Sequence, residues 1–299
     1  MLKEMLQQQY PQLMQKLISE GASSDVDDLE LCELSLALHR LASRLAPDHP
    51  EPVCRVAEAH HLLGQLREAG QHYRRALELD PPAELTADEQ ASVMRYAPLL
   101  HTTGDECFEL MDVVAIHHPN KPMIAYHLFW EDDYNFPDDY EPCDHEQVWV
   151  AYDPRSAAVT DVWAFYHSRV ITTPEAADAA NRRGGNPDVY VQWGTHGSLL
   201  AGWEKLADPA CAHLTIADDM KRTYEEVSRG GRLPEHPLKR SWPSKFAGTY
   251  EDYVDFSRHL DASDWLRRKG KIGKTAWSNA MLQQYFLTYN FHPKFDWPN

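Results

Sequence analysis

The sequence predicts an α+β fold, with a helical N-terminal part over residues 1–115 and a β-rich part over residues 116–299. Two observations lead to this prediction. In the first third of the chain, apolar residues recur at the spacing of amphipathic helices, and two helical stretches end in an acid–proline turn. From about Pro119 onward, short runs rich in Val, Tyr, Phe and Trp are separated by Pro, Gly, Asp and Asn, which is typical of strands joined by turns. A chain of 299 residues is long enough for two domains with separate cores.

The helical part has a period that can be measured. Pro47 and Pro81 each close an acid–proline turn and lie 34 residues apart. Between them, in "EPVCRVAEAHHLLGQLREAGQHYRRALELDP", Gly64 suits a tight turn between two helices, and the small Ala69 lets those helices approach each other. The period and these residues resemble the tetratricopeptide repeat family.

Weaker units of the same kind are expected before and after this segment. The first covers about residues 24–47, and the third covers residues 85–115, with Thr86 as a helix N-cap and Gly104 at a turn. Because one repeat cannot bury its apolar face alone, we expect about three stacked helix pairs, capped by a helix over residues 1–20. The resemblance implies that the helices dock a protein partner; alternatively, they only pack on the second domain.

The β-rich part is expected to form an antiparallel sheet or sandwich with peripheral helices. Its strand-like runs are "KPMIAYHLFW", "EQVWVAYD", "VTDVWAFYHSR" and "PDVYVQWGTH". Each run contains or adjoins one histidine, and these are His127, His145, His167 and His196. Since sequential strands usually pair, the four imidazoles are expected to meet at one end of the sheet. The alternative is that each is a separate hydrogen-bonded side chain, because no two of them have a short motif spacing such as HxH or HExxH.

The order of these motifs has a second resemblance. The runs "DHEQVWV", "AFYHSR" and "PDVYVQWGTHGSL", within residues 122–203, resemble the order of motifs in the necrosis-inducing-protein and vacuolar-sorting-protein-62-like superfamily. By this resemblance, Asp144, His145, Glu146 and Trp149 match the first motif, His167 matches the second and His196 matches the third. In the toxin branch of the family, the two acids beside the tryptophan help to hold a divalent cation. The family's two acids beside the tryptophan are Val148 and Val150 here, which shifts the expected ligands from oxygen toward nitrogen. The ligand set therefore favours a divalent transition metal (Fe, Zn or Cu) over Ca or Mg.

The surroundings of this predicted site are acidic and aromatic. The stretch from Glu131 to Glu146 contains eight acids and no Lys or Arg, and it is either a lid over the site or a solvated loop. Trp149 and Trp193 are candidate walls of a substrate pocket, although tryptophans at such positions are also typical of a core. Arg182 is a candidate for binding an acidic substrate.

Composition excludes several classes of partner and location. A formal net charge of −17 disfavours both nucleic acid and an anionic membrane surface, since capture of either requires clustered positive charge. No apolar run reaches the roughly 18 residues of a membrane span, and no signal-peptide pattern is present. The five cysteines are odd in number and never form CxxC, which predicts reduced thiols in a cytoplasmic protein rather than a secreted toxin.

The sequence therefore predicts a metal-dependent enzyme, a hydrolase or an oxidoreductase, that acts on a small molecule or a peptide. The predicted metal ligands are His145, His167, His196 and Asp144. Glu146 is predicted to be a ligand or the general base, and His127 is predicted to be a further ligand or a proton shuttle. The alternative is a non-catalytic binding protein that uses the helices for a partner and the Trp-lined sheet for a glycan, a lipid headgroup or a peptide.

Overall fold

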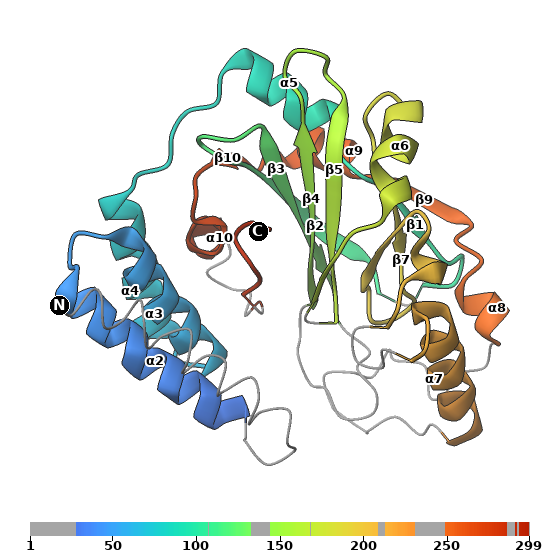
Figure 1. Ribbon diagram of the computed structural model, residues 1–299, viewed down its shortest axis with the longest axis horizontal. Helices are drawn as coiled ribbons and strands as arrows, with labels where there is room; N and C mark the ends of the chain where they lie inside the picture. Colours follow the sequence, from blue (N-terminus) through green and yellow to red (C-terminus); the bar gives the residue numbers. More distant parts are fainter. Residues whose placement is uncertain are drawn as a thin grey trace. The chain divides into compact units, whose positions relative to one another are not determined.

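The computed structural model (Figure 1) describes residues 28–298, except 107, 133–143, 168, 209–212, 231–248, 286–290 and 292. It divides into two compact units, residues 1–81 and 82–299. The first unit is helical and the second contains two β-sheets with surrounding helices, which confirms the predicted α+β class. The division falls before residue 115, so the second unit begins earlier than the sequence pattern indicated. Within the described residues, no helix combines the length and the apolar character that a membrane crossing requires.

The described part of the first unit consists of α2 (Asp28–Leu45), α3 (Pro50–Leu62) and α4 (Leu66–Leu79). Helix α3 has proline in its first turn, where the missing N–H costs no hydrogen bond. Gly64, at a φ of +69°, makes the turn between α3 and α4, and Ala69 is fully buried between them. The predicted helix pair of residues 51–81 is thus present as a hairpin, whereas its membership of the tetratricopeptide family stays a prediction. The expected capping helix over residues 1–20 lies outside the described residues.

The third helix pair expected over residues 85–115 is wrong. This segment forms one helix, α5 (Ala87–Arg95), followed by the strands β1 (Leu99–Thr102) and β2 (Leu110–His117). The expected N-cap is confirmed: Thr86 accepts a hydrogen bond from the backbone N–H of Glu89, and the Glu89 carboxylate accepts one from the N–H of Thr86. The apolar residues after Tyr96 become strands because partners from distant parts of the chain pair with them, which local propensity does not reveal.

The larger sheet has six strands in the order β10-β2-β3-β4-β5-β6. Its remaining strands are β3 (Met123–Trp130), β4 (Asp144–Tyr152), β5 (Val159–Tyr166), β6 (Arg169–Ile171) and β10 (Ile272–Lys274). Strands β2 to β6 form an antiparallel meander, and β10 joins the edge parallel to β2. Both faces are covered: Val148 packs in the main core on one face, and Phe129 packs against Leu282 of α10 (Ser278–Tyr285) on the other.

The smaller sheet has four strands in the order β8-β7-β1-β9. These are β8 (Ser198–Leu200), β7 (Asp188–Val191), β1 and β9 (Arg258–Asp261). The surrounding helices are α6 (Pro174–Arg182), the short 3-10 helix η1 (Trp203–Lys205), α7 (Ile216–Gly230), α8 (Tyr250–Tyr253) and α9 (Ala262–Lys269). One face of this sheet contributes Leu100 and Val189 to the main core, together with Val148 and Val162 of the larger sheet.

The parallel pairing of β1 with β7 positions the candidate site. Because parallel strands end at the same edge of a sheet, the loops that follow Thr102 and Val191 leave side by side. In the larger sheet, the end of β3 and the start of β4 also meet, since Trp130 pairs with Asp144. The site lies where these four chain segments come together.

Candidate functional site

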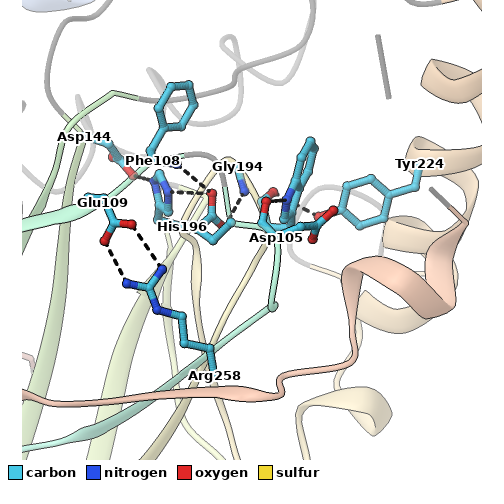
Figure 2. A network of polar contacts seen from close by, with 10 residues as sticks. Asp105, Phe108, Glu109, Asp144, Gly194, His196, Tyr224 and Arg258 are labelled. Atoms are coloured by element: carbon cyan, nitrogen blue, oxygen red, sulfur yellow. Dashed lines mark hydrogen bonds and ion pairs between the residues drawn. The ribbon is translucent and has the colours of Figure 1, made fainter. Parts of the chain in front are cut away.

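A buried histidine between two carboxylates forms the centre of the site (Figure 2). The Nδ1–H of His196 donates a hydrogen bond to Oδ2 of Asp144 at 2.8 Å. On the opposite side of the ring, Nε2 lies 3.5 Å from Oε1 of Glu106. The exposed fractions are 0% for His196, 8% for Asp144 and 9% for Glu106, so all three groups are removed from bulk water.

Backbone amides hold the Glu106 carboxylate in place. Oε2 accepts a hydrogen bond from the N–H of Gly194 at 3.1 Å, and Oε1 accepts one from the N–H of Phe108 at 3.3 Å. The two loops are also joined directly, because the indole N–H of Trp193 donates to the carbonyl of Asp105 at 3.4 Å. The loop after β1 and the loop after β7 therefore fix the position of Glu106 together.

The backbone around His196 is strained and closely packed. His196 has a φ of +51°, in the left-handed region that non-glycine residues rarely adopt. A Cβ atom on the next residue, Gly197, would lie 2.9 Å from Oε1 of Gln192 and 2.9 Å from Cδ2 of Tyr166. The indole of Trp130 stacks on the imidazole, with ring centroids 4.3 Å apart and planes 4° apart. Strain of this kind persists only where the surroundings impose it, and it is found most often at functional sites.

Electrostatics favour the imidazolium form of His196 in the absence of another cation. Burial lowers the pKa of His196, but Asp144 and Glu106 outweigh burial and raise this pKa to about 10. Burial raises the pKa of Glu106, yet its contacts with His196 and with the N–H groups of Gly194 and Phe108 bring it below its ordinary value. One positive ring between two carboxylates leaves the centre with an excess of one negative charge.

The spacing on the Nε2 side suits a metal ion. Nε2 makes no hydrogen bond to any described residue, and a tetrahedral zinc ion would separate an imidazole nitrogen from a carboxylate oxygen by roughly 3.4 Å, given bonds of about 2.0–2.2 Å. The Asp144 hydrogen bond to the other ring nitrogen is the usual arrangement behind a metal-bound histidine. The centre offers two ligand atoms to one ion, Nε2 of His196 and Oε1 of Glu106. Among the described residues of the second unit, this centre included, no three His, Cys, Asp or Glu side chains bring their ligand atoms within 4.8 Å of one another.

Comparisons with known proteins find only distant structural similarity. No protein-family model matches the chain, and no curated protein matches it. Two similar solved structures, described as "Toxin fold as basis for microbial attack and plant defense" and "Toxin fold for microbial attack and plant defense", are 18% and 17% identical to this chain. Each covers 40% of this chain, and 72% and 70% of the two known chains are matched, with TM-scores of 0.31 and 0.30.

A third similar structure is "NLPPya in complex with glucosamine". It is 15% identical, covers 56% of this chain and 95% of its own chain, and has a TM-score of 0.26. TM-scores this low carry no argument about the site or its chemistry.

Two of the predicted site residues lie on the other face of the larger sheet. The ring nitrogens Nδ1 of His127 and Nε2 of His145 are 2.9 Å apart, and Phe129 stacks on His145 with centroids 4.6 Å apart. Burial lowers the pKa of His127 to about 3, so this ring is neutral. His145 directly follows Asp144 in β4, and adjacent strand residues point to opposite faces. Strand alternation is therefore a signal in the sequence that already separates His145 from Asp144.

The other predicted residues also have separate environments. Nε2 of His167 bonds to Oε1 of Gln192 at 2.8 Å, and Oε1 of Glu146 lies 3.7 Å from Nζ of Lys294. Trp149 is fully buried and donates to the carbonyl of Asp296 at 3.1 Å. The buried Trp193 packs on Tyr253, with ring centroids 4.4 Å apart, and Arg182 is exposed on α6.

Of the predicted metal ligands, His196 and Asp144 contact each other. Glu106 is the residue that the sequence analysis did not select, because its segment was taken as part of a helix pair. The predicted acidic lid falls largely on residues 133–143, outside the described residues, and stays a prediction.

Proposed function

We propose that this chain is a metal-dependent enzyme whose divalent transition metal is bound by His196 and Glu106. Asp144 acts as the carboxylate that orients the imidazole. One observation carries the proposal: Nε2 of His196 and Oε1 of Glu106 face each other at 3.5 Å, while Nδ1 is already bonded to Asp144. The sequence-based set is thereby changed, with Glu106 in place of His145 and His167.

Each residue of the centre has a distinct task. Asp144 keeps the proton on Nδ1, which leaves the Nε2 lone pair for the cation once its proton has gone. The amides of Gly194 and Phe108 hold Glu106, so the carboxylate does not need to reorganise. Trp130 stacks on one face of the imidazole, so it excludes water from that face and restrains the orientation of the ring.

The bound ion would supply Lewis-acid chemistry, either by polarising a substrate carbonyl or by lowering the pKa of a bound water. We favour hydrolysis over oxidation. Non-haem iron oxygenases use two histidines and a carboxylate, whereas the ion pairs of this centre among the described residues involve one histidine, His196. The substrate class, a small molecule or a peptide, is carried over from the sequence analysis.

Metal analysis of the purified protein tests the proposal. We expect one zinc or iron ion per chain after equilibration, and at least a tenfold loss of affinity in the variants H196Q and E106Q. The matched control is E109Q, because Glu109 lies three residues along the same segment but is exposed and pairs with Arg258. Equal metal content in all four proteins, or none in the wild type, would support the alternative function as a non-catalytic binding protein.

A further inference from the structure

A pocket lies at the end of β1 opposite to the His196 centre. It has a volume of about 320 Å³ and is lined by Leu99, Arg183, Asn186 and Asp261. Leu99 is the first residue of β1, whereas the His196 centre lies beyond the last residue of that strand. A volume this small is at the lower end for ligand sites and suits a single small molecule.

The guanidinium of Arg183 is held in place by hydrogen bonds that involve residues of β7 and β1. Nε of Arg183 donates to Oδ2 of Asp188 at 2.9 Å, and Oδ1 of Asp188 is bonded to Nε2 of His101 at 2.6 Å. The two terminal nitrogens of Arg183 make no hydrogen bond to any described residue, and 49% of its side chain is exposed. The guanidinium is therefore oriented through one nitrogen, and its two terminal N–H₂ groups remain able to bind a carboxylate.

The pocket is also lined by the carboxylate of Asp261, which uses one of its two oxygens in a hydrogen bond. Asp261 is the N-cap of α9, and its Oδ1 accepts a hydrogen bond from the N–H of Ser263 at 2.7 Å. Its second oxygen has no hydrogen-bond partner among the described residues. Leu99 pairs with Asp188 on one side and with Asp261 on the other, so the two acids are about two strand spacings apart, roughly 9–10 Å.

We propose that this pocket binds a free α-amino acid. The ligand's carboxylate bonds to the terminal nitrogens of Arg183, its ammonium bonds to the second oxygen of Asp261, and its carbon chain packs on Leu99. A zwitterion fits better than a simple anion or cation, because the pocket is lined both by a guanidinium whose terminal nitrogens make no hydrogen bond to a described residue and by a carboxylate with one oxygen in the same condition. The amide of Asn186 is already fixed, since its Nδ2 donates to the carbonyl of Ala97 at 2.9 Å.

Calorimetric titration of the full chain with each of the twenty amino acids tests this proposal. We expect at least one to bind, and its deaminated and decarboxylated analogues to bind at least tenfold more weakly. R183Q and D261N should each weaken binding at least tenfold; asparagine is itself a good N-cap, so D261N keeps α9 intact. R182Q and D264N are matched controls, because both residues are exposed neighbours that do not line the pocket.

Three results would overturn the proposal. These are no binding by any amino acid, equal binding by the deaminated analogue, and an equal loss in R182Q or D264N. This test does not depend on the proposed metal centre, because calorimetry measures amino-acid binding directly. Protein stripped of metal with a chelator can be titrated in the same way.

Discussion

Nε2 of His196 lies 3.5 Å from Oε1 of Glu106, too far for a hydrogen bond and close enough for both atoms to bind one metal ion. The two residues belong to the loops that follow β7 and β1, and the parallel pairing of these strands brings the loops together. Since Asp144 fixes the other ring nitrogen, the distance reflects a constrained ring rather than a freely rotating one.

Metal binding at neutral pH is expected to release about one proton. The pKa of His196 is about 10 without a metal, so its imidazole is protonated at pH 7 and must lose the Nε2 proton before it can coordinate an ion. Calorimetric zinc titrations in buffers of different ionisation enthalpy measure this number. Binding with no proton release would show that the ion is held elsewhere.

The variant E106Q is expected to lower the free energy of unfolding by about 3 kcal/mol in the metal-free protein. It removes one of two carboxylates from a buried imidazolium, and breaking a buried ion pair costs on the order of 3–5 kcal/mol. The exposed pair of Glu109 with Arg258 is worth less than about 1 kcal/mol, so E109Q should stay close to wild type. Urea unfolding monitored by tryptophan fluorescence compares the two, and equal losses would contradict a special role for Glu106.

Acid is expected to destabilise the protein through His127. The pKa of His127 is about 3 in the folded state and about 6.5 in the unfolded state. Below pH 6.5 the histidine takes up a proton only in the unfolded state, so the free energy of unfolding is full above pH 6.5 and declines as the pH falls toward 3. The free energy of unfolding declines by about 1.4 kcal/mol per pH unit in this range. Unfolding curves between pH 7 and pH 5 should show a shallower dependence in H127Q than in wild type. The exposed His259 supplies the control, and H259Q should keep the wild-type slope.

The variant G197A is expected to destabilise the protein by about 1–3 kcal/mol and to weaken metal binding. The added Cβ would meet Gln192 and Tyr166 at 2.9 Å, and the displacement would be transmitted to the adjacent His196. Gly64 is a useful comparison, because its φ is positive, at +69°, unlike that of Gly197, and a Cβ there would meet nothing within 4 Å. G64A should therefore cost only the backbone strain of about 1 kcal/mol and leave metal affinity unchanged. Equal metal affinity in G197A and G64A would show that the backbone position of Gly197 does not control the metal-binding geometry of His196.

Local sequence determined the elements whose signals are local. The N-cap at Thr86, the Gly64 turn and the strand-like runs around His127 and His145 were all present as predicted, because caps, turns and side-chain alternation depend on a few neighbouring residues. The same patterns selected Asp144 and His196, which do contact each other.

Only the tertiary structure decided which groups surround His196. The residues of β1 became a strand through pairing with β7 and β9, and that pairing carried Glu106 to the imidazole. His145 and His167 were left in other environments by the face and the loop on which they lie. Long-range pairing is set by the burial of a shared core rather than by short-range propensity, so the sequence alone indicated the types of ligand but not the set that assembles.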